Sequence, residues 1–199
     1  MAPSEGYLEA VRKLCDRKKL LLIFDEVQVG MGRTGKLFAY EHYGVAPDIM
    51  TMAKGLAGGV PIGAMLAREE VAKSFTPGTH AATFGGNPLS SAAGVAALRV
   101  TLEDGILENC RRSSAHFMMR LGELQKKYPF IKEIRGKGLM IGMEFSREAK
   151  SAVNECLKRG FLINCTSDTV MRFVPPLIIT PAEIDLLIAA LDEIFSGWR

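Results

Sequence analysis

The sequence has few of the residues that build metal sites and disulfide frameworks. Its 199 residues include four cysteines and three histidines. The cysteines form no Cys-x-x-Cys pair, and the histidines lack the spacing of a zinc-binding helix. We therefore expect no metal ion and no disulfide framework, and we interpret the histidines as structural or surface residues.

Long apolar runs and basic segments interleaved with aromatic residues are missing as well. The apolar stretches fall short of the roughly 20 residues that span a bilayer. The net charge is only +3, without the basic stripe that is typical of nucleic-acid-binding domains. We therefore expect a cytoplasmic protein with neither a membrane nor a nucleic acid as a partner.

The overall composition is typical of a globular protein, and the pattern of residues differs between the first and the second half of the chain. Hydrophobic residues make up 48% and charged residues 24%, as in ordinary soluble domains. In the first half, helical and strand-like segments alternate, which predicts a mostly parallel sheet with crossover helices. The first strand, LLLIF, is apolar at every position, so we expect it to be buried on both faces. The predicted elements are a helix over 4–19, strands over 20–24, 49–53 and 63–67, and a helix from Asn87 to Leu102.

The pattern changes after Gly105. A long amphipathic helix is predicted over 106–127, followed by a turn at 134–138 between two strand-like runs, and a last helix begins at Pro181. This order is typical of a smaller α+β unit. The predicted fold is therefore α/β in two parts, with residues 1–104 as part of a large domain and residues 105–199 as a small C-terminal α+β domain.

Two polar side chains directly follow predicted strands. Asp25 ends LLLIF, and Lys54 follows IMTMA with small residues around it. Ligands of open α/β sheets bind at the carboxyl ends of strands, where a half-desolvated carboxylate needs a cation or several donors. A desolvated lysine favours its neutral amine, which can attack a carbonyl carbon. Taken singly, each residue is more simply explained as an ordinary loop residue.

Thr83 and Arg172 add two anion-binding signals. Thr83 precedes two glycines and a helix start, which suits a phosphate, although Asn87 as a plain helix cap explains the same letters. Arg172 lies in an apolar run and needs an anionic partner, either a ligand carboxylate or an internal salt bridge. Together, the four residues match the inventory of a pyridoxal-phosphate enzyme: an imine-forming lysine, a partner for the pyridine nitrogen, a phosphate contact and a carboxylate-binding arginine.

The motifs around these residues are specific enough to indicate a family. The block LLIFDEVQVGMGRTGKLFAYEHYGVAPDIMTMAKGLAGGVPIGA resembles the centre of the class III (ornithine-type) aminotransferases, which have fold type I. TFGGNPLSSAA, IRGKGLMIGMEF and VMRFVPPLIIT extend the resemblance over nearly the whole chain and are most similar to the acetylornithine branch, with the ornithine and succinylornithine branches next. The resemblance implies transfer of an amino group from N-acetylornithine, or a related ω-substituted ornithine, to 2-oxoglutarate in arginine biosynthesis.

The resemblance also implies a role for each candidate residue. Lys54 forms the imine with pyridoxal 5'-phosphate and shuttles a proton as general base and acid. Asp25 pairs with the pyridine nitrogen, and Gln28 hydrogen-bonds the ring hydroxyl or packs beside it. Thr83 contacts the phosphate from the neighbouring subunit, so a homodimer with shared sites is implied. Arg172 binds the substrate carboxylate.

One position and the length depart from the family's pattern. Position 29 is valine where the family often has threonine, and we expect a small effect there. Family members are roughly twice as long, beyond an ordinary single domain. Their other half carries the phosphate-binding turn, the ring that stacks on the pyridine and further substrate contacts. The length therefore predicts a C-terminal fragment or a truncated gene product.

Other interpretations stay open beside the enzymatic one. A truncated homologue could fold and dimerise without catalysing the reaction. Ornithine is the alternative donor, because the residues that contact the far end of the donor fall largely in the other half of the family's sequence. A nucleotide-binding α/β domain is a third class, and we expect the sequence to lack the glycine-rich loop between strand and helix that it needs.

Overall fold

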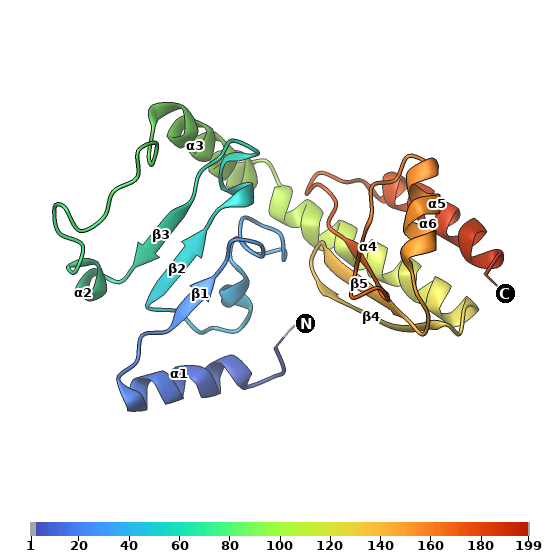
Figure 1. Ribbon diagram of the computed structural model, residues 1–199, viewed down its shortest axis with the longest axis horizontal. Helices are drawn as coiled ribbons and strands as arrows, with labels where there is room; N and C mark the ends of the chain where they lie inside the picture. Colours follow the sequence, from blue (N-terminus) through green and yellow to red (C-terminus); the bar gives the residue numbers. More distant parts are fainter. Residues whose placement is uncertain (1–2, 199) are drawn as a thin grey trace. The chain divides into compact units, whose positions relative to one another are not determined.

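The computed structural model describes residues 3–198, which form two compact units (Figure 1). The first is Pro3–Leu107 and the second begins at Glu108. Each unit has its own sheet, with strand order β1-β2-β3 in the first and β4-β5-β7-β6 in the second. No helix within residues 3–198 is long and apolar enough to cross a membrane.

The first unit is a three-stranded sheet with helices before and after it. β1 and β2 are parallel, with Asp25 opposite Thr51, whereas β3 runs antiparallel to β2. The sheet is thus mixed within the described residues, although the alternation of helix and strand is as predicted. The elements are α1 (Tyr7–Lys18), β1 (Ile23–Asp25), η1 (Ala39–His42), β2 (Ile49–Met52), η2 (Lys54–Ala57), β3 (Ala64–Ala67), α2 (Glu69–Ala72) and α3 (Pro88–Glu103).

The expected burial of LLLIF on both faces is wrong for this structure. Leu22 is buried against Cys15 of α1 and Val45, but Leu20, Leu21 and Ile23 are more than half exposed. The strand also starts at Ile23 and continues to Asp25, later than predicted. One face of β1 is covered by α1 through Leu22, whereas the side chains of Leu21 and Ile23 on the other face are not covered by any segment within residues 3–198.

Asp48 joins three elements of the first unit. Its Oδ2 accepts hydrogen bonds from the Leu22 N–H at 2.7 Å and from Arg12 Nη1 of α1 at 2.8 Å. Its Oδ1 lies 3.4 Å from Arg68 Nη1, directly after β3. The hydrogen bond from Leu22 and the charge of Arg12 hold the pKa of this buried carboxyl below its usual value. Asp48 therefore fixes α1 and β3 to the start of β1.

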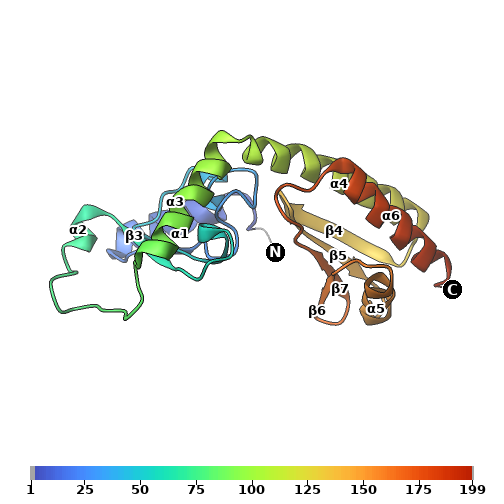
Figure 2. The same cartoon turned by 90° about the horizontal axis from the view of Figure 1, so that it is seen from above.

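The second unit is an antiparallel four-stranded sheet with helices α4 and α6 on one side, as Figure 2 shows. Side chains alternate along β5, so Ile141, Met143 and Phe145 are buried while Met140, Gly142 and Glu144 are on the other face. The buried row packs against Phe117 of α4 and Leu191 of α6. The elements are α4 (Ile106–Lys127), β4 (Ile131–Lys137), β5 (Met140–Phe145), α5 (Lys150–Lys158), β6 (Asn164–Thr166), β7 (Val170–Phe173) and α6 (Pro181–Ser196).

The turn predicted at 134–138 is wrong. Strand β4 continues through Lys137, and the turn consists of Gly138 and Leu139. Position 136 lies inside the strand and requires glycine, because a Cβ there would overlap the Met140 carbonyl oxygen and lie 2.9 Å from the Ile141 Cα. The two glycines of RGKG therefore have different roles, a close strand approach at Gly136 and a left-handed turn residue at Gly138, whose φ is 55°.

We expect Asp48→Asn to lower the free energy of unfolding by about 1–3 kcal/mol at neutral pH, because a buried hydrogen bond to a charged group is weakened. The folded pKa of Asp48 is lowered, so the charged form stabilises the fold above the ordinary aspartate pKa, and this contribution is lost as the pH falls through the folded pKa. The difference between variant and wild type should therefore shrink below about pH 4. Urea unfolding followed by circular dichroism at several pH values measures it.

Asp16→Asn is the matched control, because Asp16 also binds Arg12, at 2.7 Å, but its side chain is 63% exposed. We expect a change below about 0.5 kcal/mol for this surface pair. An equal loss in the two variants would show that Asp48 has no special role.

We expect Gly136→Ala to destabilise the second unit by about 1–3 kcal/mol, because the added methyl group forces β4 and β5 apart. Gly122→Ala should have the opposite sign and stabilise it by about 0.5–1 kcal/mol, because a helical glycine is replaced and the new Cβ meets nothing within 4 Å. Urea unfolding followed by the fluorescence of Trp198, the single tryptophan of the sequence, reports on this unit. A stable Gly136→Ala variant would contradict the close approach.

Candidate functional site

β1 and β2 are adjacent parallel strands (Figure 1). Asp25 lies at the carboxyl end of β1, and Lys54 comes two residues after the carboxyl end of β2. Asp25 is the last residue of β1 and pairs in register with Thr51 of β2, three positions before Lys54. Both side chains are exposed. Because the strands are parallel, a carboxylate and an amine are presented at the same edge of the sheet, which is where open α/β sheets bind ligands.

The Asp25 carboxylate is oriented by the chain that follows it. Its Oδ1 accepts the Val27 N–H at 2.9 Å, and its Oδ2 has no hydrogen-bond partner among residues 3–198. Gln28 is exposed in the same turn. One carboxylate oxygen is therefore fixed by the backbone, while the other remains able to accept a proton donor.

Glu26, the residue after Asp25, has a structural role. It is buried, and its two oxygens accept the N–H groups of Ala39 and Tyr40, both at 2.9 Å. Desolvation raises the pKa of Glu26, and the two backbone hydrogen bonds oppose that rise. The glycine-rich segment between Glu26 and Ala39 is thus held at both ends, which keeps the turn after Asp25 in place.

The expectation that the sequence lacks a glycine-rich nucleotide-binding motif is wrong as far as the letters go, because residues Gly30 to Gly35 match GxGxxG directly after a strand. No helix begins there, however: the segment consists of turns, with positive φ at Gly32 and Gly35, and leads to the short 3-10 helix η1. A dinucleotide-binding loop requires the glycines to open a helix whose amino end meets the phosphates. The GxGxxG motif is therefore present, but it lacks the helix start that a dinucleotide-binding loop needs.

Lys54 is in an uncommon backbone conformation. Its φ is +50°, a left-handed geometry that residues other than glycine rarely adopt. The next residue is a glycine because a Cβ there would lie 3.3 Å from the Met31 Cβ. Leu56, two residues after Lys54 in η2, is buried, and its carbonyl oxygen lies close to Gly94 of α3. Packing against α3 thus holds a strained lysine, and strained residues concentrate at functional sites.

Thr83 lies in the exposed loop that precedes α3, in the same unit as Asp25 and Lys54. The loop end is fixed by Asn87, whose Oδ1 accepts the Ser90 N–H at 3.0 Å, and by Ser90, whose Oγ donates to the Pro61 carbonyl oxygen at 3.2 Å. No hydrogen bond joins Thr83 to Asp25 or Lys54 within the described chain. Neighbouring Phe84 is 82% exposed, so this loop presents both a hydroxyl and an apolar ring to its surroundings.

Arg172 belongs to the second unit, in β7. It lies on the sheet face opposite the helices, between Gly142 of β5 and Asn164 of β6 in the register. It is half-buried and forms no ion pair with any carboxylate in residues 3–198. The internal salt bridge considered from the sequence is therefore not formed within residues 3–198.

The sequence did not single out Arg135 and Glu144, which share this sheet face with Arg172. Arg135 Nη1 contacts Glu144 Oε2 at 2.5 Å and Glu133 Oε2 at 2.6 Å. The alternation of MIGMEF is a signal that could have placed Glu144 on the polar face. The residue of β4 that pairs with Glu144 depends on where the turn between β4 and β5 lies. Because the sequence placed that turn at 134–138, inside β4, the contact with Arg135 was not predicted.

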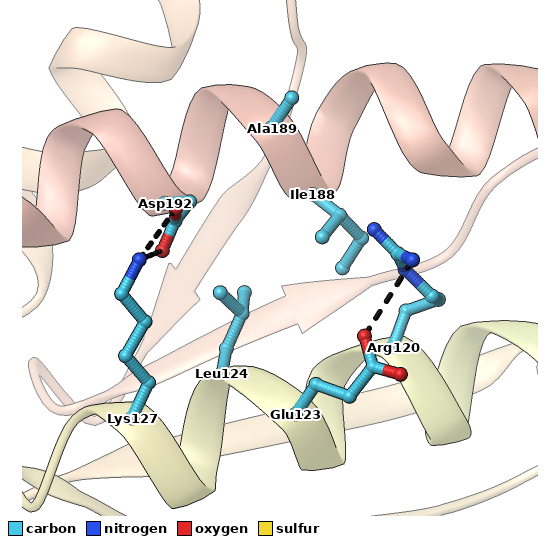
Figure 3. A pocket seen from close by; sticks show the side chains of 7 residues that line it. All are labelled: Arg120, Glu123, Leu124, Lys127, Ile188, Ala189 and Asp192. Carbon is cyan, nitrogen blue, oxygen red and sulfur yellow. Dashed lines mark hydrogen bonds and ion pairs between the residues drawn. The ribbon is translucent and has the colours of Figure 1, made fainter.

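A pocket of about 330 Å³ lies between α4 and α6 (Figure 3). Its charged side chains neutralise one another, with Lys127 bound to both oxygens of Asp192 at 2.7 Å and Arg120 3.5 Å from Glu123. It contains none of the candidate residues. Among residues 3–198, no three histidine, cysteine or acidic side chains gather as metal ligands.

Comparison with known proteins connects these residues to a family. The sequence profile described as Aminotransferase class-III matches residues 1–195. The acetylornithine aminotransferase of Methanocaldococcus jannaschii is 55% identical over 96% of this chain and 48% of that protein. The one from Caldanaerobacter subterraneus subsp. tengcongensis is 56% identical over 97% of this chain and 49% of that protein.

A solved structure gives the same result for the fold. The ornithine aminotransferase of Plasmodium yoelii superposes with a TM-score of 0.94 at 32% identity, covering 100% of this chain and 54% of that one. The chain spans about half the length of the curated relatives that it matches. Its fold is accordingly α/β, equivalent to part of a fold type I aminotransferase. On the match of 195 residues to the family profile, the chain belongs to the class-III aminotransferases.

Proposed function

We propose that this chain carries the lysine-bearing half of a pyridoxal-phosphate-dependent aminotransferase. The observation that carries the proposal is the placement of Asp25 and Lys54 at the carboxyl ends of paired parallel strands. The similarity to acetylornithine aminotransferases supports N-acetylornithine, or a related ω-substituted ornithine, as the donor and 2-oxoglutarate as the acceptor, in arginine biosynthesis in the cytoplasm. The high TM-score to an ornithine aminotransferase makes ornithine the second candidate donor.

The chemistry of the available donors and acceptors fits this cofactor. The free Oδ2 of Asp25 suits a protonated pyridine nitrogen, and the exposed amine of Lys54 suits an aldehyde. When bound, pyridoxal phosphate would supply an electron sink for the bond broken at the substrate carbon that bears the transferred amine. The residues of this chain therefore meet two requirements of the cofactor, and the other half of the family's length would supply further contacts.

Each residue has a distinct task in the proposed reaction. Asp25, oriented by the Val27 N–H, keeps the ring nitrogen protonated through its negative charge. Lys54 would hold the cofactor through its amine and, once released, would take the proton from the substrate carbon that bears the transferred amine and return it as a general acid. Gln28, in the turn after Asp25, lies beside the ring hydroxyl.

Anion binding is assigned to Thr83 and Arg172. The Thr83 hydroxyl would hold the phosphate of a neighbouring subunit, and the exposure of its loop together with Phe84 supports a homodimer with shared sites. Arg172 would hold the substrate carboxylate through paired N–H donors. A guanidinium suits both the amino donor and the oxo acid, because each carries a carboxylate.

We expect this chain, mixed with pyridoxal phosphate, to show a visible imine absorption band that Lys54→Ala abolishes. Lys73→Ala is the matched control, since Lys73 is also an exposed lysine, with a side chain 73% exposed, and should keep the band. Borohydride reduction and peptide mass spectrometry should place the label on the peptide containing Lys54. No band, or equal bands in the two variants, would show that this chain does not hold the cofactor through Lys54.

We expect Arg172→Ala to weaken use of the amino donor and of 2-oxoglutarate together. Losing hydrogen bonds to a charged group worth about 1.5–3 kcal/mol should lower kcat/KM by at least about tenfold for each substrate. Steady-state kinetics at low substrate concentration, with an active enzyme that includes the sequence of this chain, measures the effect. Unchanged values for both substrates would remove Arg172 from the site.

A further inference from the structure

Three charged residues on the polar face of the second sheet are related by the strand register. Arg135 of β4 and Arg172 of β7 both lie opposite Gly142 of β5. Glu144 lies two residues further along β5 on the same face. Diagonal neighbours on adjacent strands are about 7–8 Å apart, within reach of long side chains. Glu144 is therefore a diagonal neighbour of both arginines and could bind either.

In this structure Glu144 is held by Arg135. Arg135 Nη1 lies 2.5 Å from Glu144 Oε2, and both side chains are about two-thirds buried. The hydrogen bond with Glu144 is the largest cause that raises the pKa of Arg135. Arg172, on the other side of Gly142, forms no ion pair within residues 3–198. The carboxylate has thus paired with one arginine and left the other uncompensated.

The preference for Arg135 has a physical cause in the neighbouring strand. Glu133 of β4 lies directly opposite Glu144, and two like charges facing each other across strands destabilise the sheet. Arg135 contacts both acids and so relieves this repulsion. The residue opposite Glu144 on β7 is Val170, so Arg172 has no second acid beside it.

Gly142 keeps the space between the two arginines open. A Cβ at this position would lie 3.4 Å from Val170 Cγ1 and 4.0 Å from the Arg135 carbonyl oxygen, so a side chain could be accommodated by the backbone. Because residue 142 is glycine and has no side chain, no side chain of β5 separates Arg135 from Arg172. A displaced Glu144 could therefore reach Arg172 without obstruction.

We propose that Arg135 is a positioning residue that holds Glu144 away from Arg172 and thereby leaves Arg172 available for a carboxylate ligand. The proposal rests on the proposed function, in which Arg172 binds the substrate carboxylate. Without Arg135, Glu144 pairs with Arg172 and competes with the ligand. The competition is intramolecular, so it lowers ligand affinity without changing the ligand contacts themselves.

The test compares Arg135→Gln with the double variant Arg135→Gln/Glu144→Gln in the 199-residue chain. The side-chain Nε–H signal of Arg172 in NMR spectra reports on its partner, and titration with 2-oxoglutarate gives the apparent affinity. We expect the Arg172 signal to shift in the single variant and affinity to fall about two- to fivefold, as for a partly exposed ion pair. The double variant should restore both, because the competing carboxylate is gone.

Two further variants separate positioning from general structural damage. Arg159→Gln is the matched control, because Arg159 also lies near two glutamates, 3.1 Å from Glu155 and 3.8 Å from Glu193, and it should leave the Arg172 signal unchanged. Glu144→Gln alone removes the competitor and should keep wild-type affinity even if Arg135→Gln does not fold. Weaker binding in Glu144→Gln would overturn the proposal.

The failures of the two proposals are distinguishable. An Arg172 signal that is unchanged in Arg135→Gln, or that the second substitution does not restore, overturns the positioning role. A wild-type Arg172 signal that does not respond to 2-oxoglutarate instead overturns carboxylate binding by Arg172. In that case the arginine signals of the ligand-free variants still decide whether Arg135 holds Glu144 away.

Discussion

The parallel pairing of β1 with β2 is the constraint on which the candidate site depends. In a parallel pair both carboxyl ends lie at one edge, so residues distant in sequence, Asp25 and Lys54, are presented together. An antiparallel pair would have placed them at opposite edges. Asp48 protects this arrangement, because it ties the start of β1 to α1 and to the residue after β3. The edge that carries the candidate site is therefore held in place from the opposite end of β1.

The carboxylates of Asp48, Glu26 and Asp25 have different roles because their surroundings differ. Asp48 and Glu26 are buried and have their oxygens occupied by backbone N–H groups or arginine. Asp25 is exposed and has one oxygen fixed by Val27. The first two stabilise the fold because their hydrogen bonds are satisfied internally. The third is oriented but unsatisfied, which suits a ligand.

The sequence predicted the parts of the site that depend on local pattern. Apolar runs ending at Asp25 and just before Lys54 were enough to place both at strand ends, and most helices were found from their periodicity. The sequence could not show which faces would be covered, so the exposure of Leu21 and Ile23 was missed. It also could not show that Arg135 would hold Glu144, because that pairing depends on a turn whose position is set by the close approach at Gly136.

The left-handed backbone of Lys54 has a consequence for how this chain would change over time. A residue with a side chain costs roughly 1 kcal/mol or more in that geometry, and glycine adopts it freely. In a lineage freed from selection for the amine, glycine at this position would be favoured for stability alone. A lysine at this position therefore lowers stability relative to glycine, which agrees with the role proposed for its amine.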